Sequence, residues 1–264
     1  MQRILPGNDS LREDMKTRIL ATALAAASTL ANAAVIGTYG VTSPSAASAP
    51  ASAASGIDPA AAAKRAADAA SINQAGALTQ AHQPQAAIER GLDPLIADQE
   101  AQVRNIQASL HCAQSHAESL VYLLAAANAK KPAVVVDGTL CSAYFMRGFA
   151  EIDLGKLAAA EADYDHLTAL SPHNPHYLNE VGQFHSRMRD WNGALALFHR
   201  AEEDAKAFSV PGRADAELGL ALRGIGYVDV DVELGKLDEA EAAYRRCIEI
   251  DADDQKAKAE LGWC

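Results

Sequence analysis

The sequence predicts an all-α protein, a right-handed α-solenoid built from antiparallel helix pairs. The first observation is repetition, because residues 154–157 read LGKL and the same four letters recur at 234–237, each time ahead of an apolar helical stretch. The second is composition, because aromatic residues make up only 5% of the chain while alanine is abundant. Small side chains favour close helix–helix packing over a bulky β-sandwich core. With 264 residues, the chain is long enough to bury a sizeable core in one or two domains.

Residues 1–33 are predicted to be a secretory signal peptide. Lys16 and Arg18 precede an apolar run over 19–30, and a small-x-small cleavage signal ends at residue 33. A start at Met15 would give a more typical basic n-region than the first methionine does. The alternative is an uncleaved anchor helix, which the short run disfavours because a spanning helix needs about 20 apolar residues. We therefore expect a periplasmic or secreted protein, without stable membrane insertion after cleavage.

Residues 34–66 consist mostly of Ala, Ser, Pro, Gly and Thr, and we interpret them as a disordered linker. This composition cannot bury enough apolar surface to offset the entropy of ordering. The full chain carries 23 basic and 34 acidic residues; without residues 1–33, which hold four basic and three acidic ones, 19 and 31 remain, a net charge of −12. An acidic surface repels nucleic acid, so we expect a protein or peptide partner and no nucleic acid.

Residues 67–132 are predicted to form a divergent helical region. One helix is expected over 71–81. A second starts at Pro84, and Gly91 and Pro94 are expected to interrupt it before Pro94 opens a third.

A fourth helix is predicted over 115–129. Ser115 and Glu118 have the spacing of a capping box, in which each side chain satisfies a free backbone N–H at the helix start. The apolar residues that follow are Leu120, Leu123 and Leu124. The valines at 134–136 are too few to argue for a sheet, and we interpret them as an extended connector.

The four cysteines show no spacing typical of a zinc ribbon or a haem attachment site. Cys112 and Cys141 are expected at opposite ends of neighbouring helices, which disfavours a disulfide between them. Cys247 falls at a small, buried helix position and is interpreted as a packed thiol. Whether any of the four, Cys264 included, forms a disulfide is left open by the sequence.

A sharper pattern begins at residue 141: a small residue, a second small residue twelve positions later, and an aromatic ring four positions after that. Gly148, Ala160 and Tyr164 carry it, as do Gly182, Ala194 and Phe198, and later Ala240 with Tyr244. Small residues let two antiparallel helices cross closely, and the rings fill the space beside the crossing. These residues resemble the tetratricopeptide repeat (TPR). The resemblance implies a TPR-like region over 133–264, with repeats at 141–174, 175–208 and 221–254 and a capping helix at 255–264.

Two positions and one insertion depart from the family pattern. Arg147 stands where the family has an apolar residue, and Gly224 stands at a bulky aromatic position. Residues 209–220 add twelve residues between the second and third repeats, and we expect them to extend the first helix of the third repeat backwards.

The resemblance also implies a concave groove, lined by the first helix of each repeat, that binds a peptide or a helix of a partner. The candidate groove residues are Phe145, Phe149, Ile152, His176, Asn179, Gln183 and Asp229. We expect an apolar anchor near Phe145 and Phe149. The alternative is that the helices of 68–129 cover these two rings and use them as core, because exposed apolar patches are uncommon.

No catalytic or phosphate-binding motif is present in the sequence, and we expect no enzyme activity, metal or cofactor. His173 and His176 lie on either side of a helix boundary with Pro175 between them, so their rings need not converge on a metal. The sequence therefore predicts an exported, non-enzymatic protein–protein interaction module, an adaptor or assembly factor of the cell envelope. The alternative is a self-associating structural subunit of an envelope assembly, with the oligomeric state and the partner left open.

Overall fold

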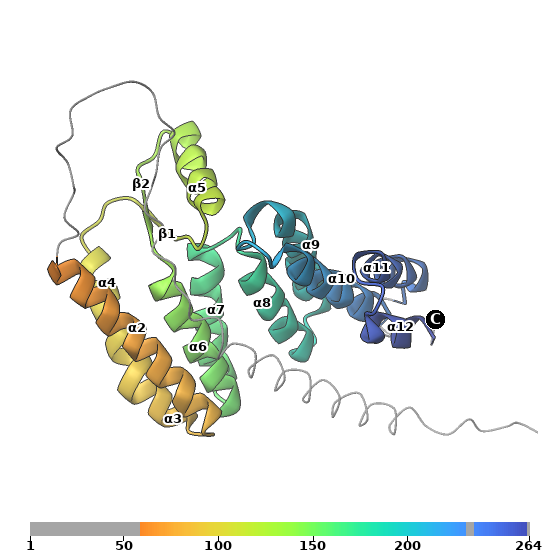
Figure 1. Cartoon of the computed structure of the whole chain (residues 1–264), viewed down its shortest axis with the longest axis horizontal. Coiled ribbons are helices and arrows are strands. Elements are labelled where there is room, and N and C mark those ends of the chain that lie inside the picture. The colour runs from red at the N-terminus through yellow and green to blue at the C-terminus, as the bar shows by residue number, and fades with distance from the viewer. Residues whose placement is uncertain (1–58, 231–234, 263–264) are drawn as a thin grey trace, which may run out of the picture.

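The fold is a row of antiparallel helix pairs with an additional helical layer at its N-terminal end (Figure 1). It was obtained as a computed structural model that describes residues 59–230 and 235–262. The signal peptide and residues 34–58 of the linker lie outside the described residues. The pairs are α6 (Thr139–Asp153) with α7 (Leu157–Leu170), α8 (Pro175–Arg187) with α9 (Trp191–Phe208), and α10 (Ala214–Val230) with α11 (Leu237–Ile250), followed by α12 (Gln255–Leu261).

Each pair crosses where a glycine of its first helix meets an aromatic ring of its second. A Cβ added to Gly148 would lie 2.6 Å from the Tyr164 ring, and one added to Gly182 would lie 2.8 Å from the Phe198 ring. No side chain fits at these distances, so only glycine allows the two helices to approach. The prediction of a helical solenoid is confirmed here, at the same glycine and aromatic residues from which it was made.

In the third pair the crossing glycine is Gly226, whose added Cβ would lie 2.7 Å from the Tyr244 ring. The predicted repeat at 221–254 placed Val228 at this position, and that register is wrong by two residues. The glycine-to-ring separation is 16 in the first two pairs (164 − 148 and 198 − 182) and 18 in the third (244 − 226), so the third connection is two residues longer. Gly224 does not replace a missing aromatic residue, because it packs on the Phe198 ring of the preceding pair.

Four segments form the N-terminal layer: α2 (Pro59–Gln80), α3 (Pro84–Ala87), the π-helical η2 (Ile88–Leu92) and α4 (Asp93–Val103). The helix is not interrupted at Gly91 and Pro94 as expected. The backbone widens to a π turn, in which the Asp93 N–H bonds the Ile88 carbonyl five residues back. Pro94 then lies in the first turn of α4, where its missing N–H leaves no intrahelical bond unmade.

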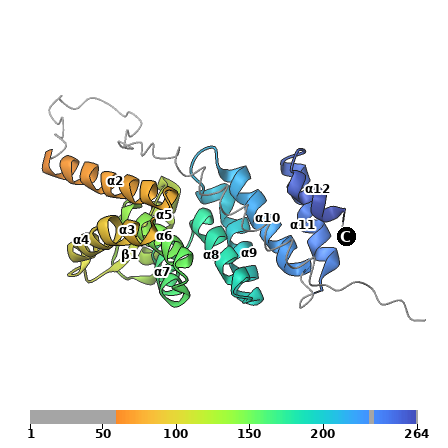
Figure 2. The same cartoon turned by 90° about the horizontal axis from the view of Figure 1, so that it is seen from below.

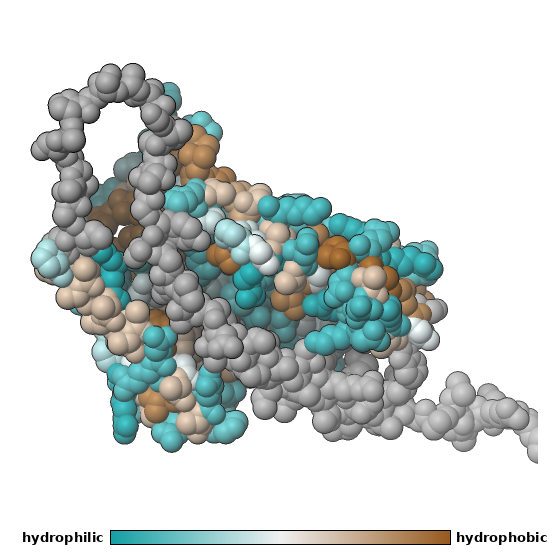
Figure 3. Space-filling view, viewed as in Figure 1, coloured by the Kyte–Doolittle hydropathy of each residue, from teal (hydrophilic) through white to brown (hydrophobic). Residues whose placement is uncertain are grey.

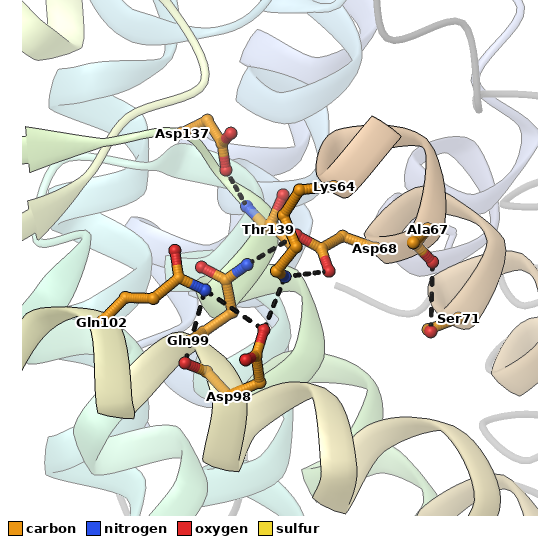
Figure 4. A network of polar contacts seen from close by, with 9 residues as sticks. All are labelled: Lys64, Ala67, Asp68, Ser71, Asp98, Gln99, Gln102, Asp137 and Thr139. Atoms are coloured by element: carbon orange, nitrogen blue, oxygen red, sulfur yellow. Dashed lines mark hydrogen bonds and ion pairs between the residues drawn. The ribbon is translucent and has the colours of Figure 1, made fainter. Parts of the chain in front are cut away.

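Helix α2 begins inside the predicted linker, at Pro59 instead of after residue 66. Its alanines favour a helix, and a polar network fixes it to α4. Lys64 pairs with Asp68 and lies 2.6 Å from the Asp98 carboxylate, while Gln99 donates a 2.8 Å hydrogen bond to Asp68 (Figure 4). The contacts of Lys64 with Asp98 and of Gln99 with Asp68 hold this helix against α4, and composition alone does not reveal them.

The N-terminal layer packs on the first repeat pair. Figure 2 shows α2 running lengthwise across this end of the molecule, and α2, α3, η2 and α4 all contact α6. Leu92 and Leu95 from this layer share one core with Leu140 and Tyr144 of α6. A second core runs through the later pairs as far as Ala257 of α12. The N-terminal helices therefore cover one face of the first repeat.

Two short strands correct the expectation of an extended connector. β1 (Ser109–Cys112) and β2 (Ala133–Val136) form a parallel pair in which Cys112 stands opposite Val136, and α5 (His116–Ala129) is the crossover between them. This pairing brings Cys112 close to the start of α6. Cys112 and Cys141 form a disulfide with a Cα–Cα distance of 6.2 Å. The expectation against it was wrong because Cys112 lies on a strand that runs back to α6, not at the end of a helix.

Among the described residues, no helix is long and apolar enough to cross a bilayer.

Candidate functional site

The predicted groove is largely filled, beginning with its aromatic anchor. Phe145 is only 6% exposed. Its ring lies 6.4 Å from Tyr164, 5.3 Å from His176 and 5.6 Å from Tyr177, measured between ring centroids. The interpretation of Phe145 as an exposed anchor is therefore wrong. The rings that cover it come from α7 and α8, and Phe145 belongs to the core that also includes Leu92 and Leu95 of the N-terminal layer.

His176 and Asn179 belong to a polar seam between α8 and α10. Asn179 is fully buried, and its amide nitrogen lies 3.0 Å from the Glu217 carbonyl oxygen and 3.3 Å from its carboxylate. Glu217 is 2% exposed and accepts two hydrogen bonds from the Arg213 guanidinium, at 3.0 and 2.7 Å. The His176 Nδ1 lies 3.6 Å from the same carboxylate. These side chains join the second pair to the third, so Asn179 cannot serve as a groove contact.

Asp229 is also buried, at 3% exposure, near the C-terminal end of α10. Its carbonyl accepts a 2.7 Å hydrogen bond from the Lys236 N–H, and the Lys236 ammonium lies 3.5 Å from its carboxylate. Its assignment to the groove followed from the two-residue register error in the third repeat. With Gly226 at the crossing, the position that corresponds to Phe149 and Gln183 is Tyr227.

Three half-buried side chains occupy equivalent positions on successive first helices. Phe149, Gln183 and Tyr227 each follow a crossing glycine by one residue, so they project about 100° around the helix from the face that meets the second helix. We call these three residues the first-helix line. Ile152, the remaining predicted groove residue of α6, packs against the core shared with the N-terminal layer.

A cavity of about 240 Å³ lies beneath α5, lined by Ser109, His111, Tyr122, Ala125, Ala126, Ala129, Lys131, Pro172 and His173. Tyr122 forms its rigid wall. The ring stacks on His111 at 4.5 Å and lies 5.9 Å from His173. The hydroxyl donates to Glu118 at 2.7 Å and accepts from the His173 N–H at 3.2 Å. Burial, with the nearby Glu118 charge, raises the pKa of Tyr122 well above its usual range, so the hydroxyl keeps its proton.

Glu118 anchors α5 to the body of the protein. The residue is fully buried, and its carboxylate accepts hydrogen bonds from the Gln114 N–H at 2.8 Å and the Ser171 hydroxyl at 2.7 Å, besides that from Tyr122. The Ser115 hydroxyl accepts from the Glu118 N–H at 3.1 Å, as the capping box predicts. This network fixes the inner face of α5 to the protein. The Glu118 carboxylate and the Tyr122 hydroxyl are therefore already hydrogen-bonded within the protein.

The outer face of α5 carries the largest group of exposed leucines in the described part of the chain. Leu120, Leu123 and Leu124 are 57%, 47% and 54% exposed. Figure 3 shows apolar side chains over α5, at the top of the view. Sequence reasoning treated these residues only as a helix pattern. The sequence does contain a signal for this surface, because residues 119–129 include no charged residue. A helix with one face in solvent usually carries charged residues on that face.

A second cavity, of about 370 Å³, lies between α2, α4 and β2. Lys64, Asp68 and Gln99 line it, and they are bonded to one another or to Asp98 in the network of Figure 4. Because these polar groups already have partners, this cavity has fewer groups available to bind a ligand than the surfaces of α5 and the first helices have. In the described ranges, no group of three or more His, Cys, Asp or Glu side chains is placed to hold a metal ion.

Comparison with known families agrees with the geometry of the pairs. The tetratricopeptide repeat model matches residues 142–174, which include the Gly148–Tyr164 crossing, and residues 230–254, which include Tyr244. No curated protein matches the chain closely enough to count as a relative. The chain therefore contains tetratricopeptide repeats, which the family model places at residues 142–174 and 230–254, and its helix pairs cross at glycine–aromatic contacts.

Proposed function

We propose that this protein is an exported, non-enzymatic adaptor or assembly factor of the cell envelope that binds a segment of a partner protein along the first helices of its repeats. Tetratricopeptide repeats indicate a protein–protein interaction module. The first-helix line carries the proposal, because Phe149, Gln183 and Tyr227 repeat one half-buried position on the first helices of three successive pairs.

The chemistry of this line suits an extended peptide. Two aromatic rings offer apolar contact area, and the Gln183 amide between them can donate to and accept from a peptide backbone. Packed helices lie about 10 Å apart, so the three positions span about 20 Å. An extended segment of about six residues covers that length. We place the binding segment there and not at Phe145 or Asn179, which are committed to packing.

Export is supported by the disulfide between Cys112 and Cys141. Both cysteines are fully buried, and disulfides persist in oxidising compartments such as the periplasm. The basic n-region and apolar run of residues 1–33 support the same proposal. Mass spectrometry of the chain from the envelope fraction of the producing cells should give an N-terminus at Ala34 and an oxidised Cys112. A chain that retains residues 15–33 in the cytoplasm, with both thiols free, would contradict export.

Binding along the first helices can be tested with a photo-crosslinking amino acid at Gln183 of the full chain, expressed in the producing cells. Matched controls carry the same group at Glu161 on α7 and Glu203 on α9, which are exposed on second helices. We expect a discrete adduct from position 183, lost on Tyr227→Ala, and none from the controls. Equal adducts from all three positions, or none from position 183, would refute the proposed site.

A further inference from the structure

We propose that the outer face of α5 is a second docking surface, which takes an amphipathic helix of another protein with carboxylates at the end that lies over Lys130 and Lys131. This surface is outside the repeats and does not depend on the first-helix line. It belongs to the crossover between β1 and β2, a part of the chain that the family model does not match.

The inner face of α5 is fixed, which makes the outer face a rigid platform. Glu118 and Tyr122 lie one turn apart on the inner side and are 0% and 3% exposed. Their hydrogen bonds to Ser171 and His173 connect the helix to the turn between the first two repeat pairs. The helix therefore cannot rotate to bury its leucines without breaking this buried network.

The outer face is apolar along its length. Leu120, Leu123 and Leu124 have the three- and four-residue spacing of one helix face, and Ala117 and Ala127 extend it by a turn in each direction. All five side chains are exposed. A helix of 14 residues is about 21 Å long, so this strip matches three to four turns of a partner helix. Apolar strips of this kind on an otherwise acidic chain mark interaction sites.

Charge at the end of the strip selects the partner. Lys130 and Lys131 are exposed and make no ion pair within the described ranges. The only carboxylate on α5, that of Glu118, is buried on the opposite face. The surface is therefore apolar with a cationic end, although the chain as a whole has a net charge of −11. Acidic side chains on the partner complement this cationic end. The C-terminal end of α5 itself carries partial negative charge and does not attract anions. The partner's carboxylates must therefore pair with the ammonium groups of Lys130 and Lys131.

The same charges disfavour a second copy of the chain as the occupant. In an antiparallel pairing of two α5 helices, the lysines of one copy would face the positive N-terminal end of the other helix, and α5 has no exposed carboxylate to receive them. A partner helix that meets these lysines with carboxylates removes the repulsion.

The test uses the mature chain, residues 34–264, with two synthetic 18-residue amphipathic helices as probes. Both carry leucines on one face. One ends in three glutamates, and the control ends in three lysines. Fluorescence anisotropy should show the acidic peptide binding at least about tenfold more tightly than the basic one, a difference of about 1.4 kcal/mol. Leu124→Glu should weaken acidic-peptide binding at least about tenfold, whereas Leu237→Glu, at an equally exposed leucine of α11, should leave it unchanged.

The double variant Lys130→Glu/Lys131→Glu should reverse the preference between the two peptides. Far-ultraviolet circular dichroism checks that each variant keeps its helices. Equal binding of the two peptides, no binding of the acidic one, or equal loss in Leu237→Glu would overturn the proposal. So would a dimer of the unliganded chain in sedimentation equilibrium that Leu124→Glu dissociates, because the occupant would then be a second copy. Binding to anionic lipid vesicles that Leu124→Glu abolishes would reassign the face to a membrane.

Discussion

The Arg147 guanidinium donates two hydrogen bonds to the Asp163 carboxylate. Its Nε and Nη2 each lie 2.7 Å from a different oxygen of the carboxylate, and its Nη1 lies 2.9 Å from Asp93. Asp163 is 5% exposed, so the guanidinium is the counter-charge that makes its burial tolerable. Arg147 departs from the repeat pattern because the N-terminal layer supplies a second carboxylate beside it. The paired carboxylates raise the pKa of Arg147 further above its usual range.

Arg147→Ala should lower the free energy of unfolding by about 3 kcal/mol, because it leaves the buried Asp163 charge unpaired. Urea unfolding at pH 7 measures it. Asp93→Asn is the matched control, since the Asp93 side chain is 51% exposed and its pairing should contribute less than about 1 kcal/mol. The double variant Arg147→Met/Asp163→Leu should recover most of the loss. If Arg147→Ala costs no more than Asp93→Asn, the pair is not the anchor described.

Gly182→Ala should destabilise the protein by about 1–3 kcal/mol, because the new methyl group would lie 2.8 Å from the Phe198 ring. Gly76→Ala in α2 is the matched control. There the methyl group meets only Met146, at 3.6 Å, and alanine is the better helix former by about 1 kcal/mol. Thermal melts should therefore move in opposite directions for the two variants. Two shifts of the same sign would mean that the glycine–aromatic crossing does not set the helix approach.

Removing the disulfide with Cys112→Ala/Cys141→Ala should cost about 2–4 kcal/mol. The bond closes a loop with a sequence separation of 29 that contains the whole α5 crossover, so the unfolded chain gains conformational freedom when it is absent. Denaturation of the wild-type chain with a reductant should reproduce the loss, and the reductant should not change the variant further. An unchanged midpoint in both experiments would show that the crossover is held by its hydrogen bonds alone.

The repeats could be predicted from sequence because their determinants are local. Gly148 and Tyr164 fix one helix pair through a contact only 16 residues apart, and the sequence gives both partners directly. Only the first helix of the third repeat was placed out of register, because Val228 fits the repeat spacing, while Gly226 fits the steric requirement of the Tyr244 ring. In that repeat, the register of the first helix is set by the close approach of Gly226 to the Tyr244 ring, and not by the residue spacing of the family pattern.

The candidate site was harder to predict because exposure depends on distant segments. Phe145 and Asn179 stand at family groove positions, yet rings from α7 and α8 bury the first and Glu217 of α10 binds the second. The disulfide was missed for a similar reason, since Cys112 reaches Cys141 only through the pairing of two four-residue strands. Such short strands give almost no periodic signal. Long-range packing, which one sequence does not display, determined these features.

Glu180→Gln should stabilise the protein near neutral pH and not at acidic pH. Partial burial on α8, together with the Glu217 charge of α10, raises the pKa of Glu180 above the ordinary 4.5, while His176, Arg187 and Arg213 oppose the shift. A carboxyl with a raised pKa binds more protons in the folded state, so stability falls as the pH rises from the unfolded pKa through the folded one. The glutamine has no such loss.

The melting temperature of Glu180→Gln should therefore exceed that of the wild type at pH 7, and the difference should disappear below pH 4.5. Glu161→Gln, at an exposed position of α7, controls for the general effect of removing one negative charge from a chain of net charge −11. The Glu180 variant should gain more than this control at pH 7, because only Glu180 bears the cost of desolvating its charge. Equal gains for the two variants, or a gain at Glu180 that persists at pH 4, would place that carboxylate in solvent and remove the burial on which the pKa argument depends.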